Sequence, residues 1–257
     1  MIILRSRAEI EKIKTSCLIV AEVLDRLIEH IKPGITTWEL NAISEDLASK
    51  KHAKPAFKGY HGYPFSLCTS VNEEVVHGMP SKQRRLKDGD IISLDFGVVF
   101  DGYYGDGALT VPVGEITEEA ARLCAVTEAS LYEGISKAIS GNRLSDISHA
   151  IQDYVEQRGF SVVREFVGHG IGQQLHESPQ IPNYGPPGKG IRLKPGMVLA
   201  VEPMINAGVP DVEIMEDKWT AVTRDRKLSA HFEHTVAVTE DGPRILTKHE
   251  NGVYNRI

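Results

Sequence analysis

The chain has 257 residues, which is long enough to bury a sizeable hydrophobic core. Apolar residues make up 41% and charged residues 25%, a composition that excludes a disordered chain. A net charge of −6 argues against a sequence-blind DNA- or RNA-binding protein. No apolar run is long enough to cross a membrane, and the charged first ten residues do not resemble a secretory signal.

Three cysteines are present, odd in number and widely spaced: Cys17, Cys68 and Cys124. They form neither a disulfide framework nor a CxxC pair. The sequence therefore indicates a reduced, cytoplasmic setting.

Two helices are predicted at the start of the chain. Apolar residues recur at spacings of three and four over residues 7–31, and a Pro-Gly pair ends this helix. Thr36 then begins a second helix as its N-cap, with Glu39 closing a capping box, and this helix runs to about Lys50. Residues 54–80 mix Gly, Pro, Tyr and His, which indicates loops and short strands that form the wall of a site.

A β-hairpin and two further helices follow. Residues 90–99 are predicted as a strand, Asp101 and Gly102 as the turn, and residues 103–113 as the returning strand. Helical patterns then cover residues 117–140 and 143–158.

The last part of the chain is predicted as short strands around a Gly-rich segment, VGHGIG. A loop rich in Pro and Gly covers residues 178–190. The expected strands are residues 161–165, 197–205, 212–222 and 231–239.

The chain contains an internal repeat, roughly residues 86–97 with 193–204. LKDGDIISLD matches LKPGMVLAVE, and each copy ends on an acid, Asp95 or Glu202. Chance is one explanation, because a turn before an apolar strand is common. We favour a duplicated half-domain, in which two halves related by a pseudo-twofold axis bring the acids face to face. No linker-like composition separates the halves, so residues 1–257 are expected to form a single α/β domain.

The two aspartates of the predicted hairpin are expected to share one face of the sheet. With the turn placed as above, Asp95 lies opposite Ala108 and Asp106 lies opposite Gly97. The aspartates are then diagonal neighbours, about 7–8 Å apart at Cα. Burying both carboxylates among apolar residues is costly unless a positive group lies between them. The alternative is a solvated sheet face.

Three further residues favour a metal site. Glu202 ends an apolar strand, Glu233 points inward by strand alternation, and His169 lies between two glycines that leave its ring unobstructed. Four ionised carboxylates are balanced by two divalent ions, which can act together on a hydrolytic reaction. An oxygen-rich set with one imidazole suits Mn²⁺, Fe²⁺, Co²⁺ or Zn²⁺ without distinguishing them.

The chain resembles the short bacterial, type I methionine aminopeptidases of the M24 metallopeptidases over nearly its whole length. The matching stretches are KPAFKGYHGYPFSLCTSVNEEVVHGMP, DGDIISLDFGVVFDGYYGDGALT, VGHGIGQQLHESPQIPNYG, GMVLAVEPM and HFEHTVAVTEDGP. This resemblance implies the pita-bread fold, an α/β unit duplicated around a dinuclear metal site.

The resemblance also implies roles for individual residues. The implied metal ligands are Asp95, Asp106, His169, Glu202 and Glu233, the same set as above. Glu202 is the implied proton shuttle. His77 and His176 are implied to contact the scissile amide and stabilise the tetrahedral intermediate. Each of these two histidines could instead be a structural residue capping a loop.

The substrate side of the site follows from the same resemblance. The implied methionine pocket consists of Phe57, Tyr60, His61, Tyr63, Cys68, Leu175 and Trp219. Aromatic rings suit a thioether through sulfur contacts. Asn72 and Ser229 match a site for a monovalent cation, Na⁺ or K⁺.

The implied activity is removal of the N-terminal methionine from nascent proteins and peptides. A hydroxide generated at the two ions attacks the first peptide bond, preferably when the second residue is small. The chain is expected to act as a cytoplasmic monomer without a membrane or specific nucleic-acid partner. The basic stretch at residues 82–87 is the candidate for a transient ribosome contact.

Two alternatives stay open. An Xaa-Pro peptidase has the same fold but carries a large N-terminal domain. A pita-bread protein that has lost catalysis would act as a binding module; the presence of all five implied ligands argues against it.

Overall fold

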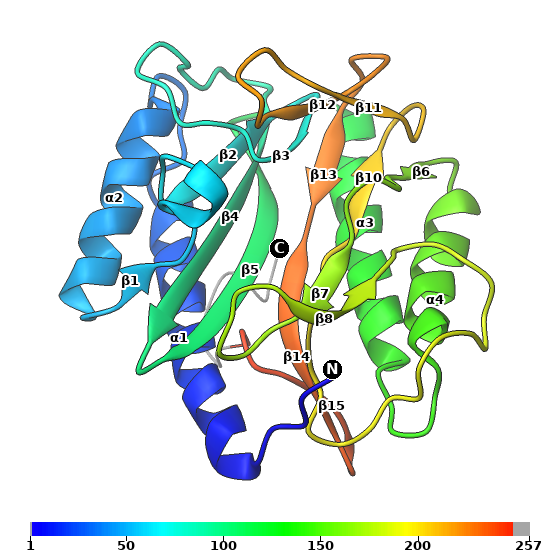
Figure 1. Ribbon diagram of the computed structural model, residues 1–257. Helices are drawn as coiled ribbons and strands as arrows, with labels where there is room; N and C mark the ends of the chain where they lie inside the picture. The colour runs from blue at the N-terminus through cyan, green and yellow to red at the C-terminus, as the bar shows by residue number, and fades with distance from the viewer. Residues whose placement is uncertain (1, 249–257) are drawn as a thin grey trace.

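A single curved sheet organises the molecule, which a computed structural model describes for residues 2–248 (Figure 1). Its strands run in the order β1-β4-β5-β14-β9-β7-β8, and all the pairings along it are antiparallel. Their bounds are β1 Lys54–Pro55, β4 Ile91–Phe100, β5 Tyr103–Pro112, β14 Glu233–Thr239, β9 Val198–Val201, β7 Gly168–Gly170 and β8 Glu177–Ile181. Two more strands lie beside this path, β2 (Leu67–Val71) next to β4 and β15 (Gly242–Ile245) next to β14.

Two small sheets and one helical turn complete the strand layer. The first small sheet joins β13 (Ser229–His231), β10 (Met204–Asn206) and β6 (Ser161–Val162). The second joins β11 (Val212–Ile214), β12 (Ala221–Thr223) and β3 (Glu74–Val76). A short 3₁₀ turn, η1 (Tyr60–Gly62), lies between β1 and β2.

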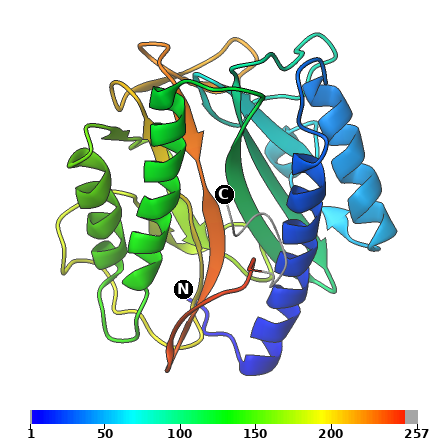
Figure 2. The same ribbon diagram turned by 180° about the vertical axis from the view of Figure 1, so that it is seen from behind.

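Four helices cover one face of the sheet. They are α1 (Arg7–Ile28), α2 (Thr37–Lys50), α3 (Glu118–Ser136) and α4 (Leu144–Glu156). Viewed from behind, α1 and α3 lie against the sheet and α2 and α4 lie further out (Figure 2). The main core fills the space between helices and sheet, with Phe96 and Leu24 fully buried in it. None of the helices within residues 2–248 has the length and apolar content that a membrane span requires.

The helix starts follow the sequence closely. Thr36 accepts from the backbone N–H of Glu39, and the Glu39 carboxylate accepts from the N–H of Thr36, so the predicted capping box is confirmed. Ser6 and Glu9 form the same arrangement at the start of α1. That helix ends at Ile28, three residues before the predicted end.

The predicted β4–β5 hairpin and its register are confirmed. Asp95 pairs with Ala108 and Gly97 pairs with Asp106. The turn residues Asp101 and Gly102 have φ values of 47° and 77°, the left-handed conformation that a two-residue hairpin turn requires.

Strand predictions in the last part of the chain are partly wrong. Residues 212–222 form the hairpin β11–β12 and not one strand, because Asp217 accepts from the backbone N–H of Trp219 and Thr220 and closes a turn. The predicted strand 197–205 is interrupted where Pro203, which has no N–H to donate, follows Glu202. The predicted loop 178–190 begins as strand β8.

The two copies of the internal repeat make matching backbone contacts. Leu86 accepts from the N–H of Gly34 at 2.7 Å, and Leu193 accepts from the N–H of Gly141 at 3.0 Å. The arginine before each leucine donates to the carbonyl of the same glycine, at 2.8 and 3.0 Å. Each repeat thus joins the loop between two helices to the strand that follows. On this support we propose that the domain is one unit built from two duplicated halves, which meet where β5 pairs with β14.

Candidate metal centre and active site

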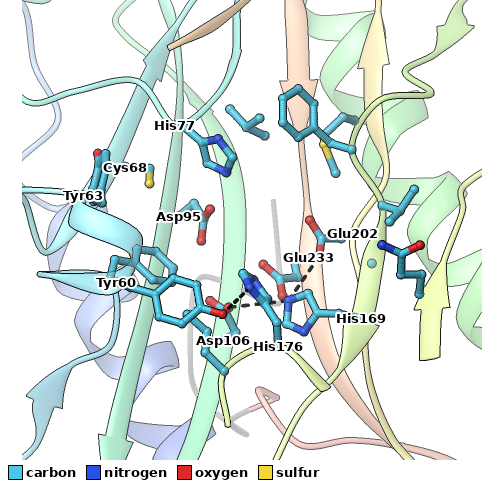
Figure 3. Close-up of a pocket in the computed structure, with 18 of the residues that line it drawn as sticks. Tyr60, Tyr63, Cys68, His77, Asp95, Asp106, His169, His176, Glu202 and Glu233 are labelled. Carbon is cyan, nitrogen blue, oxygen red and sulfur yellow. Dashed lines mark hydrogen bonds and ion pairs between the residues drawn. The ribbon is translucent and has the colours of Figure 1, made fainter. Parts of the chain in front are cut away.

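A cavity of about 460 Å³ lies over the middle of the sheet (Figure 3). Its lining includes the five candidate ligands and the two candidate catalytic histidines. These seven are His77, Asp95, Asp106, His169, His176, Glu202 and Glu233.

The four acids come from four adjacent strands of the sheet. Asp95 is on β4 and Asp106 on β5, Glu233 begins β14, and Glu202 follows the last residue of β9. Ala108 pairs with Asp95 on one side and with Glu233 on the other, so these side chains share a face. Asp106 lies two residues from Ala108 and therefore points the same way. The small alanine leaves the space between the carboxylates open.

His169 is oriented by its own strand. Its Nδ1 donates to the carbonyl of Gly170 at 2.9 Å, which directs Nε2 toward the acids. Nε2 lies 3.4 Å from Glu202 Oε1 and 4.0 Å from Asp106 Oδ2. Ligand atoms of Asp106, His169 and Glu233 lie within 4.8 Å of one another, a spacing that suits one metal ion.

The glycines around His169 are required by close backbone packing. A Cβ at Gly168 would lie 2.3 Å from the carbonyl oxygen of Ala200, and a Cβ at Gly170 would lie 2.4 Å from that of Ser178. Any side chain at either position would push β7 away from its neighbours. The two glycines therefore allow β7 to approach the backbone of its neighbours closely.

The acid cluster concentrates negative charge in a buried place. Burial, together with repulsion from neighbouring carboxylates, raises the pKa values of Asp95, Glu202 and Glu233 well above their usual range. Burial raises the pKa of Asp106 to about 7, although the N–H of Gly107 donates to it. Among the described residues that line the cavity, none is a lysine or an arginine.

The donor set fits divalent metal ions. Oxygen donors with one imidazole are the ligands that such ions take in hydrolytic sites, and their charge offsets the repulsion among the acids. Asp95 Oδ1 is buried and has no hydrogen-bond partner within the described part of the chain, so it is available as a ligand atom. His231 Nε2 lies 3.7 Å from Glu202 Oε2 and supports the cluster from outside.

The two further histidines lie on opposite sides of the cluster. His77 follows β3 with a φ of 60° and packs edge-on against Phe166. The ring of His176 lies 4.3 Å from that of His169, and its Nδ1 forms a 2.9 Å hydrogen bond with the hydroxyl of Tyr60. Burial lowers the pKa of His77 to about 4 and also lowers that of His176, so both rings are neutral at pH 7.

The predicted methionine pocket forms one wall of the same cavity, with one exception. Its lining includes Phe57, Tyr60, Tyr63, Cys68, Leu175 and Trp219. The Tyr63 hydroxyl donates to backbone carbonyls, which turns its ring toward Trp219 at 5.2 Å. His61 is exposed and lies outside the lining, with its ring packed on that of Tyr60 at 4.4 Å.

Sequence reasoning missed the other wall of the cavity. Val76, Phe166 and Met204 line it. They belong to β3, to a loop and to β10, so no common motif joins them in the sequence. The position of Phe166, just before the Gly-rich segment, was the one available signal.

The two residues matched to a monovalent cation site are neighbours. The backbone N–H of Ser229 donates to the carbonyl of Asn72 at 2.8 Å. Asn72 Oδ1 accepts from the N–H of Ile91. Cation binding at this position stays a prediction.

Comparison with known proteins identifies the family. The model of metallopeptidase family M24 matches residues 11–240. The chain belongs to this family. The chain is therefore a metallopeptidase, an enzyme that hydrolyses peptide bonds with the help of divalent metal ions.

Within the family, this M24 metallopeptidase closely resembles methionine aminopeptidases in sequence and structure. It is 57% identical over 248 residues to methionine aminopeptidase 1 of Bacillus subtilis, covering 96% of this chain and 100% of that one. It is 53% identical over 247 residues to the methionine aminopeptidase of Clostridium acetobutylicum, with 96% and 99% covered. The crystal structure of the methionine aminopeptidase from Thermotoga maritima superposes with a TM-score of 0.96 at 49% identity, covering 97% and 100%.

Prolidases share the fold over part of their length. The prolidase from Pyrococcus furiosus matches with a TM-score of 0.77 at 25% identity, covering 97% of this chain but 66% of that one. The fold of this M24 metallopeptidase is thus the pita-bread fold, as the sequence predicts.

Proposed function

We propose that this M24 metallopeptidase removes the N-terminal methionine from peptides and nascent proteins. The observation that carries the proposal is the cavity itself, where an aromatic pocket adjoins a cluster of four acids and a histidine. Similarity to methionine aminopeptidases over nearly the full length of both chains supports it. The partial overlap with prolidases makes an Xaa-Pro peptidase the weaker candidate.

The metal ligands in this proposal are the five residues predicted from the sequence. Asp95, Asp106, His169, Glu202 and Glu233 would hold two divalent ions. Bound ions of this kind activate a water molecule and polarise a scissile carbonyl. The like charges of the acids, which have no basic residue beside them in the described cavity, support two ions.

The protein's own groups then bind, orient and move protons. Glu202 accepts a proton from the attacking water and passes it to the leaving amine. The neutral rings of His77 and His176 donate hydrogen bonds to the scissile amide and to the oxygen that becomes negative. The α-amino group of a chain end would approach the ions and the carboxylates around them, which restricts cleavage to the first residue.

The substrate methionine lies in this proposal against the packed rings of Tyr63 and Trp219. A thioether gains from contact with aromatic rings, and Cys68 adds a small polarisable wall. The second wall, formed by Val76, Phe166 and Met204, faces the next residue and favours a small one.

Trp219→Ala is expected to reduce discrimination between methionine and leucine at the first position by about tenfold, because one wall of the pocket is lost. The measurement is the ratio of kcat/KM for Met-Ala-Ser and Leu-Ala-Ser. Trp38→Ala is the matched control, since Trp38 packs on Phe65 outside the cavity lining. An unchanged ratio in Trp219→Ala would remove that residue from the pocket.

His77→Ala is expected to lower kcat by about 10²–10³-fold while two ions stay bound. The reason is that His77 donates a hydrogen bond to the reacting carbonyl and lies outside the ligand cluster. Steady-state kinetics and metal analysis of the same sample check this. Loss of metal from the variant would make His77 a ligand instead.

The direct test of the proposed function is peptide hydrolysis by the metal-stripped protein after separate addition of Mn²⁺, Fe²⁺, Co²⁺ or Zn²⁺. The substrates are Met-Ala-Ser, Leu-Ala-Ser and a Gly-Pro dipeptide. Release of methionine and of no other residue, and only after metal has been added, supports the proposal. The ion that restores the activity identifies the metal. Preferred cleavage of Gly-Pro moves the assignment to the Xaa-Pro branch. If the protein is folded and binds metal but cleaves none of the peptides, the assignment changes to a binding module.

The cellular setting belongs to the same proposal. Free thiols at Cys17, Cys68 and Cys124 support a reduced, cytoplasmic location, where new N-termini appear. We propose that the chain acts there as a monomer and contacts the ribosome transiently through residues 82–87. Addition of Na⁺ or K⁺ to the peptide assay tests the cation site at Asn72 and Ser229.

A further inference from the structure

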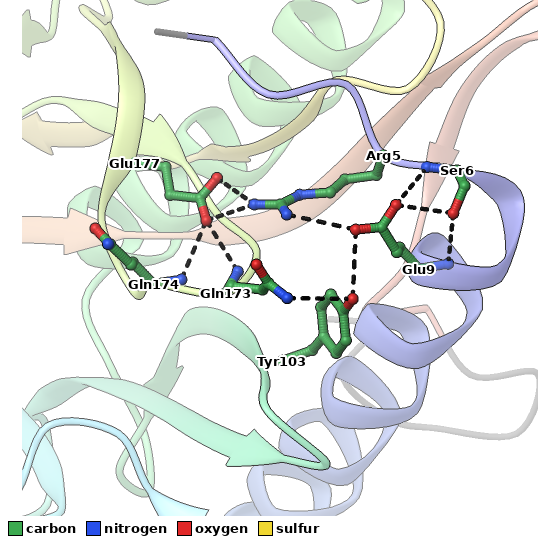
Figure 4. Close-up of polar contacts among 7 residues, drawn as sticks. All are labelled: Arg5, Ser6, Glu9, Tyr103, Gln173, Gln174 and Glu177. Atoms are coloured by element: carbon green, nitrogen blue, oxygen red, sulfur yellow. Dashed lines mark hydrogen bonds and ion pairs between the residues drawn. The ribbon is translucent and has the colours of Figure 1, made fainter.

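A buried arginine lies next to the active site without being part of it. The side chain of Arg5 is 2% exposed, and its Nη2 donates to both carboxylate oxygens of Glu177, at 2.5 and 2.6 Å (Figure 4). Its Nη1 lies 3.6 Å from Glu9 Oε1. A charge buried this deeply is costly unless its partners are held in place, so the arrangement is sensitive to the loss of any member.

Glu177 closes the turn that carries His176. Its Oε1 accepts from the backbone N–H of Gln173 at 2.9 Å and of Gln174 at 3.1 Å. His176 lies between these residues and Glu177, at the point where the turn reaches the cavity. The carboxylate that Arg5 binds therefore fixes both ends of the short segment from which the His176 ring extends.

The guanidinium group also packs directly on the start of this turn. A Cβ at Gly172 would lie 2.3 Å from Arg5 Nη2 and 2.6 Å from Cζ, so the arginine occupies the space that a side chain would fill. The carbonyl of Gly172 in turn accepts from the N–H of Tyr104 at 2.7 Å. The turn is thus held between Arg5 and strand β5.

Arg5 itself is fixed to both halves of the molecule. Its backbone N–H donates to the carbonyl of Gly196 at 2.7 Å, just before β9. Glu9, which faces its guanidinium, belongs to α1 and lies 3.3 Å from the hydroxyl of Tyr103 on β5. A displacement of the N-terminal segment would therefore be passed to the His176 turn.

We propose that Arg5 is a positioning residue that holds His176 over the scissile bond by way of Glu177. The proposal rests on the proposed function of the cavity. His169 has a second anchor that does not involve Arg5, because β7 pairs with β9 at Ala200 as well as with β8, where Gly170 lies opposite Glu177. Loss of Arg5 should consequently disturb His176 while the metal ligands keep their places.

The test compares Arg5→Ala, Arg5→Lys and Glu177→Gln with the parent protein. In Arg5→Ala, kcat for Met-Ala-Ser is expected to fall about 10–100-fold, with KM and the two-ion stoichiometry little changed. Arg5→Lys is expected to recover part of kcat, because an ammonium group still neutralises Glu177 but lacks the planar surface that packs on Gly172. Glu177→Gln should resemble Arg5→Ala, since its amide oxygen keeps the turn N–H partners but loses the ion pair.

A second measurement does not depend on catalysis. In the metal-free protein, the NMR resonance of the His176 ring is expected to shift in Arg5→Ala while that of His77 stays unchanged. Arg244→Ala is the control, because it removes an exposed ion pair between Glu11 of α1 and β15. That variant should leave both kcat and the His176 resonance unaltered.

The outcomes separate this proposal from the function on which it rests. A parent protein that releases no methionine overturns the proposed function, while a His176 shift still supports the positioning by Arg5. Unchanged kcat and an unchanged His176 resonance in Arg5→Ala overturn the positioning role. Equal shifts at His176 and His77 also overturn it, because they indicate a general loosening. If Arg5→Ala does not fold, kcat and the His176 resonance of Arg5→Lys and Glu177→Gln test the positioning role in its place.

Discussion

Asparagine in place of Asp95 is expected to stabilise the metal-free protein and to destabilise the metal-loaded one. Without ions, burial and the neighbouring Asp106 raise the pKa of Asp95, which means that its charge opposes folding. With ions bound, the same charge is attracted to them and a neutral amide cannot replace it. Urea unfolding of the parent protein and of Asp95→Asn, with and without added metal, measures the sign of the change in the free energy of unfolding in each state.

The pH dependence of the metal-free protein follows from the same raised pKa values. An acid whose pKa is higher in the folded state holds more protons there, so stability is lost as the pH rises toward the folded value. For Asp106 the folded pKa is about 7, against an ordinary 3.8. The metal-free protein should therefore be less stable at pH 8 than at pH 5. Each proton by which the two states differ contributes a slope of about 1.4 kcal/mol per pH unit. Asp95→Asn should flatten this dependence.

Asp95→Asn is also expected to lose activity. Because bound ions supply several kcal/mol of transition-state stabilisation, Asp95→Asn should lower kcat by about 10³-fold or more. Calorimetry should show fewer than two ions bound tightly. Asp241→Asn changes an exposed acid and should alter none of these quantities. Normal two-ion stoichiometry in Asp95→Asn would contradict its assignment as a ligand.

The second large effect is expected for Glu202→Gln. A glutamine has nearly the same shape but cannot accept and return a proton, so kcat should fall about 10²–10⁴-fold. His169 Nε2 lies 3.4 Å from Glu202 Oε1, and Glu202 is a proposed ligand, so metal affinity should fall as well. Single-turnover kinetics at saturating metal separate the two losses, because added metal restores occupancy and not proton transfer.

Glu240→Gln serves as the control for Glu202→Gln, since Glu240 is exposed beyond the end of β14. At saturating metal, recovery of full kcat in Glu202→Gln would leave Glu202 as a ligand and exclude it as the proton carrier. A persistent deficit at full metal occupancy supports proton transfer by Glu202, and a higher metal concentration needed to reach that occupancy supports its role as a ligand.

The sequence predicted those parts of the site that depend on local patterns. The Asp-Gly turn set the register of β4 and β5, and this register placed Asp95 and Asp106 on one face. The repeat pointed to Glu202 as the counterpart of Asp95 in the second half. The register prediction was correct because strand alternation and turn geometry act over a few residues, whereas the repeat stays a prediction.

Features that depend on distant contacts could not be predicted in this way. Arg5 and Glu177 are 172 positions apart in the chain, and neither belongs to a recognisable motif. Phe166 and Met204 reach the cavity through the relative placement of separate elements. His61 was assigned to the pocket with its neighbours, but it is exposed and lies outside the cavity lining.

The joint between the halves has a consequence for how the protein reaches its native state. Strands β4 and β5 pair over ten positions across a two-residue turn, whereas β14 pairs with β5 at Ala108 and Gly107 alone. Closing the long loop between β5 and β14 costs more entropy than forming the hairpin, so we expect the hairpin early and the joint late.

The acids lie on both sides of this joint, so the proposed metal site would be complete in the joined state alone. A ligand that binds only the native state, at a free concentration of a hundred times its Kd, stabilises that state by about 2.7 kcal/mol. Newly made chains that lack metal should consequently open at the joint more often and be degraded faster. The supply of divalent ions in the cell would then set how much of this protein persists, besides how fast each copy works.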